Sequence, residues 1–83
     1  MVQPEEILQR LRKRPFEPFR VILKSGKHYD ILNHQNNIVY TWALSIGIPV
    51  EGMEDPIADH VDFIALDQID RLETLLASTQ QAS

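Results

Sequence analysis

The chain has 83 residues, a net charge of −4 and no cysteine. This length fits one small domain, and the missing thiols exclude disulfides, thiolate metal sites and cysteine nucleophiles. Hydrophobic residues make up 43% of the chain and charged residues 24%, which is typical of a globular protein. The first residues lack the pattern of a secretory signal and no apolar run is long enough to cross a membrane, so we expect a cytoplasmic protein without membrane contact.

Residues 4–14, PEEILQRLRKR, are expected to form a short amphipathic helix. Pro4 suits the first helical position, two glutamates follow where the helix dipole favours anions, and three basic residues occupy the last turn. Pro15 then ends the helix, because the residue before a proline avoids the α region. The helix dipole accounts for most of the early positive charge without any ligand.

The segment FRVILKSGKHYDI, residues 19–31, carries the clearest supersecondary signal. A type I turn at 24–26, with Gly26 in the left-handed conformation, predicts a hairpin closed by a G1 bulge. The expected pairs are Leu23 with Lys27, Ile22 with His28, Val21 with Tyr29, Arg20 with Asp30, and Phe19 with Ile31. This register places Phe19, Val21, Tyr29 and Ile31 on one face, as in a hairpin with one buried side.

The remaining segments predict further strands. The alternating run IVYTWALSIGI, residues 38–48, is expected to form one long, strongly bent strand. Its core face would consist of Ile38, Tyr40, Trp42, Leu44, Ile46 and Ile48. On this interpretation Tyr40 and Trp42 are core residues rather than a pair that stacks nucleic-acid bases. Residues 49–59 predict an acidic loop, residues 60–66 and 69–75 two strands joined by a tight turn at LDQ, and residues 77–83 a flexible C-terminal tail.

The order of these segments resembles the plan of an Sm-like or SH3-like small barrel. The helix that leads directly into FRVILKSGKHYDI is similar to the start of an Sm-like protomer, and ALDQIDRLETL resembles the one-turn helix that joins the last two strands there. The expected fold class is mainly β (α+β): a short N-terminal helix followed by a five-stranded, strongly bent antiparallel sheet or small barrel, in one domain spanning residues 1–76.

A narrower resemblance covers about residues 8–38. The stretch RPFEPFRVILKSGKHYDILNHQ is similar to a family of small uncharacterised bacterial proteins with a pattern like PFxPFxIxLxDGxxYxVxHP, and the closing HVDFIALDQIDRLE is more weakly similar to it. The chain departs from this pattern at Ser25, where an acid is more common, and at Gln35, where proline is more common. The family implies a fold and no established activity.

The Sm-like resemblance also implies a way to bind RNA and a way to assemble. Sm-like RNA binders use polar residues after the second strand, here HQNN at 34–37, together with basic residues before the last strand. The second place, 67–70, holds DQID and no base. Edge pairing of the fourth and fifth strands between protomers, which forms rings in that fold, does not depend on these residues.

Nucleic-acid binding normally depends on phosphate neutralisation by Lys and Arg. The candidate phosphate contacts are Arg10, Arg12, Lys13, Arg14 and Arg20. The chain is acidic overall and most of its acids lie in the second half, a charge split that fits protein–protein contacts at least as well. We therefore expect a second copy or another protein as partner, and keep an Sm-like RNA-binding protein as the alternative.

Two His-x-Asp pairs form a possible set of metal ligands. They are His28, Asp30, His60 and Asp62. A metal-dependent activity through them is a third hypothesis, but alternate positions on a solvated strand face produce the same spacing. The sequence therefore predicts no metal and no cofactor. No nucleophile motif surrounds either Ser25 or Ser45, so no catalytic residue is predicted either.

Four apolar residues are expected to lie opposite the core faces of their strands. They are Ile22, Leu32, Ile64 and Leu66. Apolar side chains outside the core of a small domain are usually covered by its helix or by another chain. This short helix can cover only part of them. The sequence therefore predicts a non-enzymatic interaction or assembly module that forms a homo-oligomer.

Overall fold

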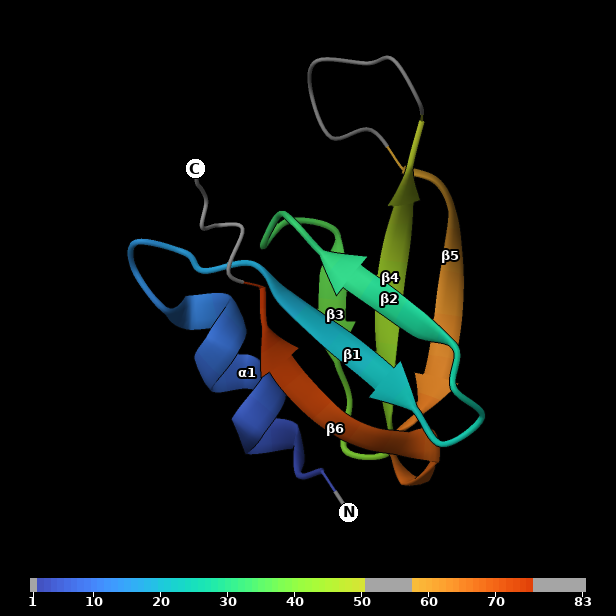
Figure 1. Cartoon of the computed structure of the whole chain (residues 1–83). Coiled ribbons are helices and arrows are strands. Elements are labelled where there is room, and N and C mark those ends of the chain that lie inside the picture. Colours follow the sequence, from blue (N-terminus) through green and yellow to red (C-terminus); the bar gives the residue numbers. More distant parts are fainter. Residues whose placement is uncertain (1, 51–57, 76–83) are drawn as a thin grey trace.

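The structure, a computed structural model, describes residues 2–50 and 58–75 (Figure 1). Within these ranges the chain is mainly β, with one short α-helix and two antiparallel sheets of three strands each. The elements are α1 (Pro4–Arg12), β1 (Phe19–Leu23), β2 (His28–Ile31), β3 (Asn37–Val39), β4 (Ala43–Pro49), β5 (Ala58–Ala65), the 3-10 helix η1 (Leu66–Gln68) and β6 (Ile69–Thr74). The strand orders are β2-β1-β6 in the first sheet and β3-β4-β5 in the second.

The expected helix-then-strands order is confirmed, but the five-stranded sheet or closed barrel is wrong. The strands of residues 2–50 and 58–75 form two separate sheets, which lie one behind the other in Figure 1. The expected barrel needs one long strand that passes from one sheet into the other. The chain instead turns back within 38–48, so β3 pairs with β4 and stays in the second sheet.

Helix α1 begins and packs much as the sequence predicts, although it ends at Arg12. The backbone N–H of Gln3 donates to the Glu6 carboxylate at 3.2 Å, which satisfies a donor just ahead of the first turn. Ile7 and Leu11, one helical turn apart, are buried in the core between the sheets. The helix lies beside β6 in Figure 1 and also contacts β3, so it covers one open side of the two-sheet core.

The β1–β2 hairpin has the predicted register in full. Strand pairs join Phe19 to Ile31, Arg20 to Asp30, Val21 to Tyr29 and Ile22 to His28, and the Leu23 N–H donates to the Lys27 carbonyl at 2.8 Å. Gly26 has the left-handed φ of +96° that the turn requires. The side chains of Phe19, Val21 and Ile31 are buried in the core.

Arg20 and Asp30 form a two-pronged ion pair across this hairpin. The Arg20 Nε and Nη2 atoms donate to the two Asp30 carboxylate oxygens at 2.6 and 3.2 Å. The hydrogen bond from Arg20 holds the pKa of the Asp30 carboxyl below its ordinary value. Because the folded-state pKa is lowered, the pair stabilises the fold above the ordinary carboxyl pKa of about 4, and this contribution is lost as the pH falls through the lowered value.

We expect Asp30→Asn to lower the urea midpoint of unfolding slightly at neutral pH, because the pair is partly exposed and such pairs contribute little. The difference from wild type should shrink at a second, acidic pH well below the ordinary carboxyl pKa of about 4, as the wild-type carboxyl also loses its charge. Urea titrations at the two pH values measure this. Asp67→Asn, which removes a carboxylate with no ion pair in residues 2–50 and 58–75, is the control. A midpoint difference that persists at acid pH would contradict the assignment.

The segment 38–48 is a hairpin and not one bent strand. Strand β3 pairs with β4 through Ile38 and Ser45, and the Tyr40 N–H donates to the Ala43 carbonyl at 2.8 Å across a two-residue turn. The predicted core face is therefore wrong in its first half. Leu44 and Ile46 are buried as expected, whereas Ile38 and Trp42 are 56% and 64% exposed.

Strand β5 also has the opposite orientation from the one predicted. Ile64 is 5% exposed and Leu66, which begins η1, is 3% exposed, so both belong to the protomer's own core. Phe63 and Val61 lie on the other side and are exposed. The polar Asp62 shares the inward side with Ile64, and the Tyr29 hydroxyl donates to its carboxylate at 2.8 Å. This bond joins β2 of one sheet to β5 of the other.

The closing elements match the prediction. The tight turn at LDQ is the 3-10 helix η1, and β6 follows it and pairs with β1 through Val21 and Leu72. The centre of the predicted acidic loop, 51–57, and the predicted tail, 77–83, lie outside the described residues. Among the residues that the structure describes, no helix is long and apolar enough to cross a membrane.

Candidate functional site

The outward side of the β3-β4-β5 sheet, which faces away from the other sheet, is apolar and exposed. We call it the aromatic face. It comprises Ile38, Tyr40, Trp42, Val61 and Phe63, around the small residues of β4. Trp42 and Phe63 are 64% and 62% exposed. The largest exposed apolar patch of a small protein is often a functional contact site.

The sequence of β4 explains how this face forms. Strand register places Ile38 and Phe63 on either side of Ser45, on the same side of the sheet. Ser45 is small, so rings from the two outer strands can extend over it. The Tyr40 ring lies 6.1 Å from Phe63 and 6.0 Å from Trp42, nearly parallel to the latter. Ser45 is only 4% exposed, so the aromatic side chains are the outermost groups here.

A groove adjoins one end of the aromatic face. It has a volume of about 380 Å³, and its walls include Trp42 from the β3–β4 turn and Val2 and Pro4 from the start of α1. The backbone N–H of Leu66 donates to the Trp42 carbonyl at 2.9 Å, which fixes the turn against η1. The Trp42 backbone is therefore held in place although its side chain is exposed.

Positive charge is absent from this part of the chain. No Lys or Arg occurs between Lys27 and Arg71, a stretch that contains β3, β4 and β5. The described side chains of the aromatic face carry no formal charge of either sign. The face can therefore bury apolar area against a partner but offers no cation for a phosphate.

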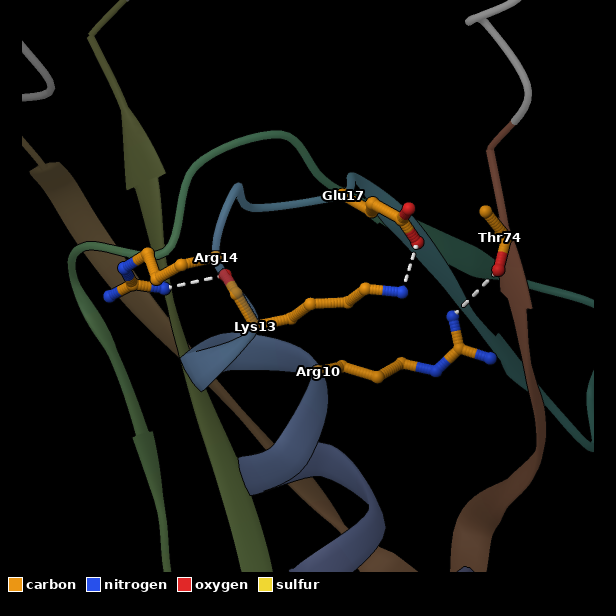
Figure 2. A network of polar contacts seen from close by, with 5 residues as sticks. All are labelled: Arg10, Lys13, Arg14, Glu17 and Thr74. Atoms are coloured by element: carbon orange, nitrogen blue, oxygen red, sulfur yellow. Dashed lines mark hydrogen bonds and ion pairs between the residues drawn. The ribbon is translucent and has the colours of Figure 1, made fainter.

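Three of the predicted nucleic-acid residues, Arg10, Lys13 and Arg14, lie around the end of α1 (Figure 2). Arg10 donates to the Thr74 hydroxyl at 3.1 Å and lies over the Phe19 ring, with its Cζ 5.5 Å from the ring centre. Lys13 pairs with Glu17 at 3.0 Å.

The remaining residues of this basic set are Arg12, Arg14 and Arg20. Arg14 donates to the backbone carbonyls of Leu11 and Lys13 at 2.9 and 2.8 Å. Arg20 binds Asp30, as described above. Arg12 is exposed, and the contacts described for the other basic residues do not involve it. Most of this positive charge therefore already interacts with groups of the chain itself.

A second groove, of about 640 Å³, runs between α1 and β6. Its walls carry charges of both signs, with Glu6 and Arg10 from α1 and Asp70 and Arg71 from β6. Arg71 is held by Asp70 and Glu73 at 2.6 and 2.8 Å. Lys13 also lines the groove, which therefore carries three cationic and two acidic side chains. Lys13 and Arg71 are already held in ion pairs within the chain.

The two predicted His-x-Asp pairs are not brought together. His28 and Asp30 lie on the side of β2 opposite the buried Ile31, while Asp62 lies inward on β5 and is bound by Tyr29. His60 lies near Asp62, with 3.6 Å between its Nε2 and the carboxylate. In residues 2–50 and 58–75 no three His, Asp or Glu side chains are grouped as a metal would require.

The predicted oligomer-interface residues are divided by the structure. Leu32 is 68% exposed and Ile22 is half-buried, but neither belongs to the aromatic face, and Ile64 and Leu66 are core residues, so their assignment to the surface is wrong. Sequence reasoning placed Trp42 in the core and missed Phe63 altogether. The signal available was the length of the 38–48 run, which exceeds an ordinary strand.

Comparison of the chain with protein-family models, curated proteins and solved structures finds no match. The resemblance to Sm-like barrels and to the bacterial PFxPF family therefore stays a prediction from sequence.

Proposed function

We propose that this chain is a non-enzymatic interaction module that works by binding protein surfaces and that assembles into a homo-oligomer. The observation that supports this most directly is the aromatic face, where Trp42 and Phe63 are each more than 60% exposed on an ordered strand or turn. Aromatic side chains are enriched at the centres of protein interfaces.

The energetic argument rests on the same two residues. An aromatic side chain offers about 200 Å² of surface, so Trp42 and Phe63 together leave about 250 Å² exposed. Burying that area is worth about 6 kcal/mol, before the entropic costs of association are subtracted. A gain of this size offsets much of those costs, and the rest of the interface must supply the remainder.

RNA binding through the basic set at Arg10–Arg20 has less support. Arg10, Lys13, Arg14 and Arg20 already contact groups of the chain, and phosphate would have to displace them. The two aromatic residues that could stack bases, Tyr40 and Trp42, lie on a different surface without cations. The metal-dependent hypothesis has less support for the same kind of reason, because its ligand pairs lie on different sides of the sheets.

Sedimentation equilibrium of the full chain tests the proposal. We expect an average mass that rises with concentration above that of one chain. Native mass spectrometry of the protein as purified from its source would identify any other bound protein. A strict single-chain mass at high micromolar concentration, with no protein bound, contradicts the proposal. A mobility shift of RNA at low salt that disappears in Arg12→Ala would favour the RNA alternative instead.

A further inference from the structure

We propose that the aromatic face is covered by the same face of a second copy, so that two β3-β4-β5 sheets pack against each other around a twofold axis. This inference rests on the proposed function and deepens it by naming the surface and the symmetry. In such an isologous contact each residue meets a residue of the same patch, so the patch must be compatible with itself.

The charge of the face meets that requirement. Its described side chains are uncharged, so a self-contact places no like charges directly against each other. A partner selected by charge would gain nothing here and would lose the hydration of its own charged groups. The face can bury its apolar area only against another apolar surface. The same face of a second copy is such a surface.

The size of the face fits a small dimer. Its five large side chains expose on the order of 500 Å², near the upper range of apolar patches on monomers. A standard interface buries about 800 Å² on each partner, so this patch supplies more than half of one interface. The groove beside Trp42 adds contact area at one end.

The shape of the face also fits sheet-on-sheet packing. Ser45 and Ala43 of β4 are buried beneath the aromatic side chains, so neither projects from the centre of the face. With no side chain projecting there, two such faces can approach to the usual spacing of packed sheets, about 10 Å.

A tryptophan in the face supplies a local readout. Trp42 is the one tryptophan of the sequence, so its fluorescence reports on the aromatic face alone. On dilution from a concentration at which the protein is dimeric, we expect its emission to shift to longer wavelength and its quenching by acrylamide to rise. Both changes should follow the same dissociation curve as the mass.

Phe63→Glu is the decisive variant, and Leu32→Glu its matched control. The two residues are similarly exposed, at 62% and 68%, but Leu32 lies outside the aromatic face. We expect Phe63→Glu to weaken dimerisation about a hundredfold or more, because it buries an unpaired charge near the axis, and Leu32→Glu to leave it unchanged. Circular dichroism at low concentration checks that both variants fold. If Phe63→Glu does not fold, Val61→Glu replaces it in the same experiment.

Salt separates this arrangement from a head-to-tail contact between the aromatic face and the basic end of α1. Added salt should leave the isologous dimer unchanged or strengthen it, because the contact is apolar and the segment around it is acidic. A head-to-tail contact should weaken with salt and in Arg12→Glu, and either result would overturn the twofold proposal.

The remaining outcomes distinguish the two proposals. Association that survives Phe63→Glu, or that leaves Trp42 emission unchanged, overturns the twofold contact while the assembly function stands. A single-chain mass in the wild type, with no bound protein, overturns both.

Discussion

Replacing Ile64 by alanine is expected to lower the free energy of unfolding by about 2–4 kcal/mol, whereas the same change at the adjacent Phe63 should cost less than about 1 kcal/mol. Ile64 is 5% exposed and packs between the sheets, so its removal leaves a cavity. Phe63 is 62% exposed and loses mainly its contact with Tyr40. A side chain from the surface contributes little to the stability of a single chain.

Urea unfolding followed by circular dichroism measures both changes, at a concentration low enough for the chain to be monomeric. The comparison is sharp because the two residues are neighbours and the larger side chain is expected to matter less. If Phe63→Ala proved the more destabilising, β5 would have the orientation that the sequence first suggests, and the aromatic face would not exist.

Phe19→Ala is expected to cause the largest loss of stability, about 3–5 kcal/mol. Phe19 is fully buried, its ring meets that of Phe16 edge to face at 6.3 Å, and the Arg10 guanidinium lies over it. It therefore joins α1, the connecting segment and β1. A small domain has about 5–15 kcal/mol of stability in total, so this single substitution should remove a large share of it.

Thermal and urea unfolding of Phe19→Ala measure this loss, with Phe19→Leu as the control that keeps most of the buried volume. We expect the leucine variant to recover most of the stability, because the cavity is much smaller. Phe16→Ala should cost less than Phe19→Ala, since Phe16 is only partly buried. Equal losses in the alanine and leucine variants at position 19 would contradict a packing role.

The β1–β2 hairpin could be predicted from sequence because its turn has a strong local signal. Gly26 supplies the positive φ that a G1 bulge needs, and only one register then buries Phe19 and Val21 together. Local chemistry and burial agree there, so the residues decide the structure.

The β3–β4 hairpin gives no such signal. Its turn residues are Thr41 and Trp42, neither of which has positive φ, so the usual Asn-Gly or Gly-Gly mark of a tight hairpin is missing. Alternation continues through the turn, and a period of two cannot distinguish one long strand from two short ones. The candidate site was missed for this reason, since the turn is what brings Trp42 to the surface.

The orientation of β5 was missed because both of its sides are apolar enough to be buried. The polarity of the residues favours an orientation that buries Val61 and Phe63 in the core. The alternative orientation buries Ile64 but also turns the charged Asp62 toward the core. The structure takes that alternative, and the Tyr29 hydroxyl hydrogen-bonds the Asp62 carboxylate. A contact between residues 33 positions apart cannot be read from a local pattern.

The distribution of Lys and Arg along the sequence affects how the protein interacts with charged surfaces. Residues 32–68 contain six acids and no Lys or Arg, while the rest of the chain contains eight basic and six acidic residues, a net of +2. Charge is therefore divided unevenly along the sequence, −6 in one part and +2 in the other, despite the modest net charge of the whole chain. Attraction to an anionic surface would come from the residues outside 32–68 and would weaken as salt is added.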